Sequence, residues 1–282
     1  MDENKLLTAI DLPEGYMIAD CISKTNGGEL CRYIISKVDY DEENNDVTIR
    51  HAVMTIRSDF SYDISEDYTP QSRAFECCGH NIAEWESDIV DADSGDILVE
   101  GYNGTSEYDI NRTRKLYDFP IDENRFVYST GGYESIPGFG IYDFSSGTAT
   151  DVPDSADLVP IGVHGGKIYS VKAVWSGFGT DLYTTDTETL ETEFFMECPF
   201  NAGIDDYADY AMPESGDYIA LIFTPHDTEV PEVLYGINPD TKEVVSADIP
   251  NEFEHYSLLR LEENSVMISN CSDKILIAEI DV

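Results

Sequence analysis

The side chains of this 282-residue chain that could do chemistry are aromatic rings beside carboxylates in short polar loops. An aromatic face next to a carboxylate suits a stacked sugar ring with hydrogen-bonded hydroxyls. It also suits an organic cation or a Lys/Arg-rich peptide. The alternative is that these rings only cover the ends of strands. The candidate ligand-binding residues are Tyr133, Glu134, Trp175, Phe178, His226, Asp227 and Glu229, with Phe200, Asp205 and His80 in related loops.

Signatures of catalysis are weaker. A glycosidase needs two carboxylates that flank one bond, but a chain with 57 acidic residues contains such pairs by chance. The five histidines fall in different segments without a recurring partner, and no nucleophile elbow, zinc-protease helix or phosphate-binding loop occurs. We therefore assign no catalytic residue. Two functions stay open: a non-catalytic binding or scaffold module for a peptide, protein or carbohydrate, and a carbohydrate-active hydrolase or lyase with paired carboxylates.

Metal ligands are also sparse. The six cysteines show no C-x-x-C spacing, so we expect packed thiols and no zinc site. Cys77 and Cys78 are adjacent, and neighbours on one strand point to opposite faces. Calcium is the one ion with a candidate site, at the oxygen-rich turns that begin at Asp39 and Asp91. Neither turn has the spacing of an EF-hand loop, and Asp, Asn and Gly form β-turns without metal. We expect no cofactor.

The charge of the chain limits its partners. Asp plus Glu outnumber Lys plus Arg by 57 to 16, which gives a formal charge of −41. Such a field repels phosphates, so nucleic acids and anionic membranes are poor partners, whereas basic peptides and neutral sugars remain open. No apolar run is long enough to span a membrane, and we expect a monomer. The acidic start of the chain predicts a cytoplasmic protein; the alternative is a secreted or cell-surface domain whose export signal lies outside this chain.

Short alternating runs bounded by Gly, Pro, Asp and Asn dominate the sequence, and helical periodicity is scarce. The stretch from Arg125 to Pro153 shows the pattern best, with two apolar runs around Gly131-Gly132 and a tight turn that opens at Asp143. Equivalent polar turns begin at Asp39, Asp91, Asp143, Asp186, Asn238 and Asp281, at intervals of 52, 52, 43, 52 and 43 residues. This spacing indicates an array of four-stranded units.

Six units of four strands without helices predict a single all-β domain, a six-bladed β-propeller. Met17-Ile18 and Met267-Ile268 lie in nine-residue segments that match at a constant offset of 250, which suits a closed ring. We expect equivalent second strands there, with Cys21 and Cys271 as reduced thiols. The expected repeats cover residues 5–53, 54–102, 113–153, 157–197, 206–249 and 256–282.

One of these units resembles a kelch-type blade. Gly131-Gly132-Tyr133 follows its second strand, Tyr142-Asp143 ends its third, and Pro153 closes the unit. Ala149 stands where kelch blades carry a tryptophan, and the other units lack the Gly-Gly pair. The resemblance covers one blade and implies a propeller fold.

The two ends of the chain raise the question of how the ring closes. The last unit stops after its third strand, Lys274 to Ile280, and Met1 to Asn4 are too few to form another strand before Leu6 begins the first unit. We therefore expect the outer position of the last blade to be empty, or filled by residues absent from this chain.

Overall fold

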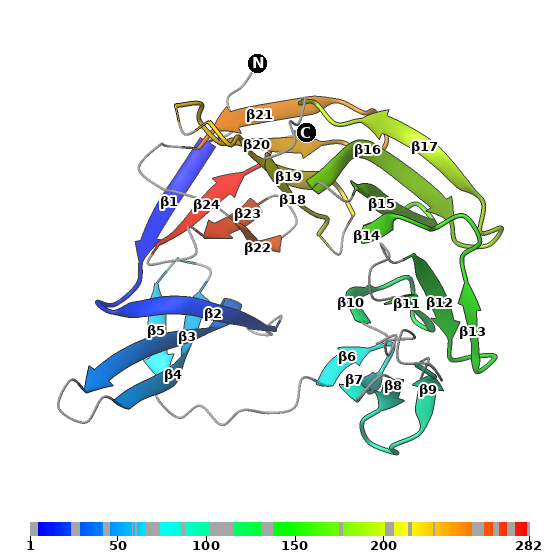
Figure 1. The fold of residues 1–282 in the computed structure, drawn as a ribbon, viewed down its shortest axis with the longest axis horizontal. Helices are drawn as coiled ribbons and strands as arrows, with labels where there is room; N and C mark the ends of the chain where they lie inside the picture. Colours follow the sequence, from blue (N-terminus) through cyan, green and yellow to red (C-terminus); the bar gives the residue numbers. More distant parts are fainter. Residues whose placement is uncertain are drawn as a thin grey trace.

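The computed structural model describes residues 5–23, 29–41, 46–57, 59, 61–65, 74–85, 88–101, 116–130, 138–174, 177–200, 206–213, 216–227, 229–249, 257–261, 265–269 and 274–280. These residues form 24 strands in six four-stranded antiparallel sheets. The sheets are arranged around a common centre as a six-bladed β-propeller (Figure 1). This confirms the predicted all-β fold. The described part of the chain contains no helix long and apolar enough to cross a membrane.

In five of the six blades the strands follow chain order from the centre of the ring outward (Figure 1). The first blade has β2 (Tyr16–Ser23), β3 (Glu29–Asp41), β4 (Asp46–Arg57) and β5 (Tyr62–Ser65). The second has β6 (Ala74–Cys77), β7 (His80–Trp85), β8 (Asp88–Asp91) and β9 (Ile97–Val99). The third has β10 (Leu116–Pro120), β11 (Arg125–Ser129), β12 (Phe139–Asp143) and β13 (Thr148–Asp151). The fourth has β14 (Leu158–His164), β15 (Lys167–Val174), β16 (Gly177–Asp186) and β17 (Thr192–Glu197). The fifth has β18 (Tyr207–Ala211), β19 (Ile219–Thr224), β20 (Val233–Ile237) and β21 (Val244–Asp248).

The last blade closes the ring within the chain. Its sheet has the order β22 (Ser257–Leu261), β23 (Ser265–Ser269), β24 (Lys274–Glu279) and β1 (Lys5–Asp11). β1 is the outermost strand, paired antiparallel to β24 from Lys5 opposite Glu279 to Asp11 opposite Lys274. The expected empty outer position is therefore wrong. The run that begins at Leu6, assigned to the first repeat, supplies the fourth strand of the last one.

That change shifts the strand assignment of the first two blades by one position. The outer strand of the first blade is the four-residue β5, which lies within residues 54–102, the range expected for the second repeat. Consequently β6, which begins at Ala74, is the first strand of the second blade. The two matching sequence segments, around Met17 and Met267, are not structurally equivalent, because β2 is an innermost strand and β23 a second strand. The side chains of Cys21 and Cys271 lie outside the described residues, so their reduced state stays a prediction.

The core lies between the blades. The middle strands are buried on both faces, as at β19, where five of six residues are buried, whereas all four residues of the outer strand β13 are exposed. This decrease in burial from the middle to the outer strands explains why the sequences of the middle strands are nearly continuous apolar runs and those of the outer strands are polar. Five clusters of buried side chains each join two neighbouring blades.

The recurring Asp turns connect the third and fourth strands of the blades. Asp143 Oδ1 accepts hydrogen bonds from the Ser145 amide, at 2.7 Å, and from the Ser145 hydroxyl, at 2.6 Å. These bonds lower the pKa of Asp143 below its ordinary value. The Gly147 amide, at a φ of 65°, donates to the Asp143 carbonyl. Side-chain caps of the same kind occur at Asp91, Asp186 and Asn238. The predicted polar turns are confirmed at these four positions.

Two other local expectations are wrong. β3 continues to Asp41, so Asp39 lies within a strand, where it forms an ion pair with Arg50 at 3.0 Å, and does not open a turn. Cys77 and Cys78 do not point to opposite faces, because β6 ends at Cys77 and Cys78 has a φ of 57°. Their sulfurs lie 3.5 Å apart as a result.

Connections leave the propeller on two faces. We call the hairpin face the one with the turns between first and second strands and between third and fourth strands. The loop face carries the connections between second and third strands and those between successive blades.

Candidate functional site

The loop face carries three of the predicted site residues in the described part of the chain, all on the connection between β19 and β20. His226, Asp227 and Glu229 are exposed there. The His226 amide donates to Asp206 Oδ1 at 2.8 Å, and the Glu229 amide donates to Asp227 Oδ1 at 3.0 Å. The Asp227 carboxylate therefore holds its own loop, while the His226 and Glu229 side chains remain accessible to a ligand.

The other predicted residues are not brought together in the described structure. Tyr133, Glu134, Trp175 and Asp205 lie outside the described residues, as does the side chain of Phe178, whose backbone belongs to β16.

Phe200 is buried and stacks on Phe223, with ring centroids 4.4 Å apart. It packs in the core between the fourth and fifth blades and offers no open ring. At Phe200 the alternative given above, that the aromatic rings only cover the ends of strands, is therefore correct.

His80 lies on the hairpin face, because β6 and β7 are the first and second strands of their blade. Its ring stacks on Phe144 of the third blade, with centroids 3.9 Å apart and planes 7° apart. Its Nδ1 lies 3.3 Å from Asp91 Oδ2. His80 therefore joins two blades on the face opposite to the one with His226, Asp227 and Glu229.

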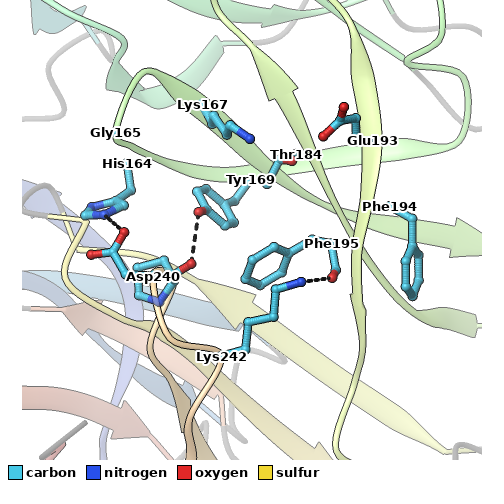
Figure 2. A pocket seen from close by; sticks show the side chains of 11 residues that line it. His164, Gly165, Lys167, Tyr169, Thr184, Glu193, Phe194, Phe195, Asp240 and Lys242 are labelled. Carbon is cyan, nitrogen blue, oxygen red and sulfur yellow. Dashed lines mark hydrogen bonds and ion pairs between the residues drawn. The ribbon is translucent and has the colours of Figure 1, made fainter.

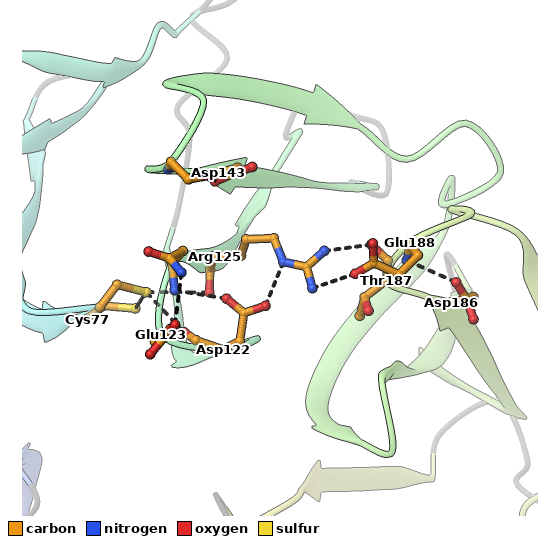
Figure 3. A network of polar contacts seen from close by, with 11 residues as sticks. Cys77, Asp122, Glu123, Arg125, Asp143, Asp186, Thr187 and Glu188 are labelled. Carbon is orange, nitrogen blue, oxygen red and sulfur yellow. Dashed lines mark hydrogen bonds and ion pairs between the residues drawn. The ribbon is translucent and has the colours of Figure 1, made fainter.

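A second junction of the same kind involves Arg125, at the start of β11 (Figure 3). Its guanidinium donates to Asp122 Oδ2 at 2.7 Å and to the Thr187 carbonyl at 3.0 Å, and it pairs with Glu188 Oε1 at 2.8 Å. Thr187 and Glu188 belong to the turn between β16 and β17, in the next blade. The first turn of one blade thus contacts the last turn of the next, as at His80 and Phe144.

The third junction of this series, between the fourth and fifth blades, contains a pocket of about 310 Å³ (Figure 2). His164 Nε2 lies 3.1 Å from Asp240 Oδ1, and the buried Tyr169 hydroxyl donates to the Pro239 carbonyl at 3.4 Å. The residues that line the pocket are His164, Gly165, Lys167, Tyr169, Thr184, Glu193, Phe194, Phe195, Pro239, Asp240 and Lys242.

A break in strand register shapes one wall of the pocket. Leu182 pairs with Met196 and Tyr183 with Phe194, so Phe195 is an extra residue without a partner in the ladder. Such a bulge leaves its own carbonyl out of the sheet pairing. Lys242 Nζ donates to that carbonyl at 2.7 Å and lies 4.6 Å from the centroid of the Phe195 ring.

The pocket offers hydrogen-bonding groups of both signs. The ammonium of Lys167, the carboxylate of Glu193 and the hydroxyl of Thr184 come from adjacent strands of one sheet. The Phe194 ring is 55% exposed, but it points away from these groups and contacts Tyr183, with ring centroids 5.8 Å apart (Figure 2). Such a mixture can bind a ligand with many hydroxyls and little charge. Within the described residues, no three His, Cys, Asp or Glu side chains are grouped as a metal site.

These pocket residues were missed in the sequence. The bulge at Phe195 has no signature, because ETEFFME reads as a plain strand with either phenylalanine inward. The sequence feature that could have indicated them is the last turn of each blade. Asn238 occupies the place of Asp143 in the fifth blade, and the turn that it opens supplies Asp240 and Lys242.

Comparison with known proteins supports the fold alone. No protein-family model and no curated protein matches the chain. A protein of unknown function from Dyadobacter fermentans DSM 18053 is similar with a TM-score of 0.54 and 10% identity, over 100% of both chains. TolB from Acinetobacter baumannii (TM-score 0.42, 10% identity, 94% of this chain and 80% of that one) and an oligogalacturonate lyase in complex with manganese (0.46, 8%, 100% and 99%) are more distant.

Proposed function

We propose that this propeller is a non-catalytic binding module and that the pocket between its fourth and fifth blades binds a carbohydrate. The observation that carries the proposal is a pocket in which the ammonium of Lys167, the hydroxyl of Thr184 and the carboxylate of Glu193 lie together near the Tyr169 ring (Figure 2). Donors and acceptors placed together match the hydroxyl groups of a sugar.

The state of the pocket carboxylates supports binding without catalysis. A glycosidase uses one carboxylic acid whose pKa burial has raised, opposite a second carboxylate. Glu193 is exposed, and the Asp240 side chain is 75% exposed and paired with His164. Both pocket carboxylates are therefore open to solvent.

Two other readings make different predictions. A basic peptide or protein is supported by the charge of −41 and the exposed loop of His226, Asp227 and Glu229. Its affinity would fall steeply with salt, whereas that of a neutral sugar would hardly change. A carbohydrate-active enzyme would use Glu193 and Asp240 as its pair and release a cleaved product.

A glycan and peptide array on the purified protein identifies the ligand class, and titration calorimetry at low and high salt then measures affinity. For a bound glycan we expect Lys167→Ala to weaken binding roughly tenfold or more, the scale of one lost hydrogen bond to a charged group. Lys172→Ala, which removes a lysine of the same strand outside the pocket, should leave affinity unchanged. Binding of basic peptides alone, lost at high salt, contradicts the proposal. So does glycan cleavage that Glu193→Gln abolishes.

A further inference from the structure

Cys77 and Cys78 are two adjacent thiols at the junction between the second and third blades (Figure 3). Cys77 is 2% exposed and packs in the cluster that these two blades share, whereas Cys78 is half-buried. The sequence predicts side chains on opposite faces of a strand, but the two sulfurs lie 3.5 Å apart. The pair lies outside the pocket of the proposed function, so its chemistry is a separate question.

The turn that brings the sulfurs together holds a cysteine in an unfavourable backbone conformation. β6 ends at Cys77 and β7 begins at His80, so Cys78 and Gly79 form the two-residue connection of a hairpin. Their φ angles are 57° and 74°, as in a type I′ turn. Asn is the usual residue at the first of these positions, and other side chains pay a steric cost in the left-handed region. The rest of the hairpin therefore keeps Cys78 in this conformation.

The hydrogen bonds of the two thiols fix the direction in which each points. The Cys78 thiol donates to the Asp122 carbonyl, with 3.3 Å between sulfur and oxygen, and its sulfur lies 3.6 Å from the Arg125 carbonyl. Because a thiol has one hydrogen atom, the contact between the two sulfurs is a bond that Cys77 donates to Cys78. The Cys77 sulfur is thus already directed at the sulfur of its neighbour.

We propose that Cys77 and Cys78 are a redox modification site, at which a low-molecular-weight disulfide oxidises the two thiols reversibly to a Cys77–Cys78 disulfide. The Cys78 thiolate attacks one sulfur of the reagent, forms a mixed disulfide and releases one thiol. Cys77 then loses its proton and attacks the Cys78 sulfur, which releases the second thiol. Two electrons and two protons pass to the reagent, which is reduced to two thiols as the pair is oxidised.

The geometry of adjacent residues makes such a disulfide easy to reduce. Adjacent Cα atoms are about 3.8 Å apart across a trans peptide bond, whereas the Cα atoms of most disulfides are about 4.4–6.8 Å apart. The short span strains the bond, and strained disulfides are the labile ones. Oxidation also removes the thiol hydrogen that the Asp122 carbonyl accepts, and with it a contact between the two blades. Both effects favour the reduced pair, so the site responds to redox conditions and does not lock the fold.

The rate of exchange at neutral pH is limited by the amount of thiolate. Burial raises the pKa of the Cys78 thiol, the hydrogen bond from Cys77 opposes this shift, and the negative charge of Asp122 adds to it. Below its pKa the thiolate fraction, and the rate of attack with it, rises about tenfold for each pH unit. The exchange is therefore best followed at about pH 8.5.

Mass spectrometry of the protein incubated with oxidised β-mercaptoethanol tests the site. This reagent is neutral, so the charge of −41 does not repel it. After alkylation of the remaining thiols in denaturant and digestion, we expect the peptide with Cys77 and Cys78 to carry an internal disulfide that dithiothreitol reduces. Cys198, a buried thiol without an adjacent cysteine, is the control and should be alkylated throughout.

Two variants separate disulfide formation from simple reactivity of Cys78. Cys77→Ala removes the thiol that resolves the mixed disulfide, so Cys78 should carry roughly tenfold more of the reagent's thiol than in the parent. Cys78→Asn keeps the turn with its preferred residue, and the buried Cys77 should then stay unmodified. If Cys77→Ala does not fold, Cys78→Asn and the parent still test the site. A stable mixed disulfide on Cys78 in the parent overturns the proposal, as does a pair that stays reduced at every ratio of oxidised to reduced reagent.

Discussion

Tyr128 reaches Asp151 across an intervening strand, with its hydroxyl 2.7 Å from Asp151 Oδ1. The two residues lie on β11 and β13, and Gly140 of β12 is the cross-strand partner of both. A Cβ atom on Gly140 would lie 2.3 Å from the Tyr128 ring. The absence of a side chain at Gly140 is what lets the phenol ring cross the middle of the third blade.

Gly140→Ala should therefore destabilise the protein by about 2–3 kcal/mol, since overpacking of a buried site forces the ring and backbone to shift. Urea denaturation measures the loss. Tyr128→Leu in the same chain removes the clash, so the double variant should be less unstable than the sum of the single variants. Additive effects would show that Gly140 is required for another reason.

Asp143→Ala should lower the free energy of unfolding measurably, because the amide and hydroxyl of Ser145 lose their acceptor. Asp143→Asn keeps the acceptor oxygen and should change stability little, as Asn238 fills the same place in the fifth blade. Thermal or urea unfolding compares the two variants. Equal losses in Ala and Asn would mean that the negative charge, and not the cap, stabilises the turn.

The turn motif was predictable because its chemistry is local. Asp143 and its equivalents need only a few residues to form their hydrogen bonds, so the spacing of the turns gave the number of blades. Closure of the ring by β1 was not predictable, because the run beginning at Leu6 has the same alternation whether it pairs with the first or the last blade. β5, at Tyr62, is too short and acidic to stand out from its loop.

The pocket depends on relations that no single segment contains. Lys242 and Phe195 are 47 positions apart, and they meet because a bulge in β17 frees a carbonyl at the edge of the neighbouring blade. His164 and Asp240 likewise meet only once two blades have packed. A pattern of apolar and polar residues predicts strands, but it does not predict which turns of neighbouring blades meet.

Arg125→Lys should destabilise the junction between the third and fourth blades by about 1–2 kcal/mol. A single ammonium cannot reproduce the planar fork that contacts Asp122, Thr187 and Glu188 together. Glu188→Gln should cost roughly 0.5 kcal/mol or less, because the Glu188 side chain is 75% exposed and its ion pair is weakened by solvent. Equal costs in both variants would contradict the view that the Thr187 carbonyl and Asp122 are the main partners.

Alkaline pH should destabilise the protein through buried groups that stay protonated in the fold. Burial raises the pKa of the Cys198 thiol to about 11 and that of the Tyr117 phenol to about 12. Between pH 9 and 11 the unfolded chain loses the Cys198 proton while the native chain keeps it, so the native state binds more protons and its stability falls as pH rises. The Tyr117 phenol extends this loss from about pH 10 to 12. Below pH 9 neither group contributes to the slope of the free energy of unfolding against pH.

Urea denaturation at pH 8, 9, 10 and 10.5 should show the decline in stability, and Cys198→Ala should reduce its steepness without removing the part that comes from Tyr117. An unchanged slope in Cys198→Ala would show that the thiol ionises as readily in the fold as in the unfolded chain.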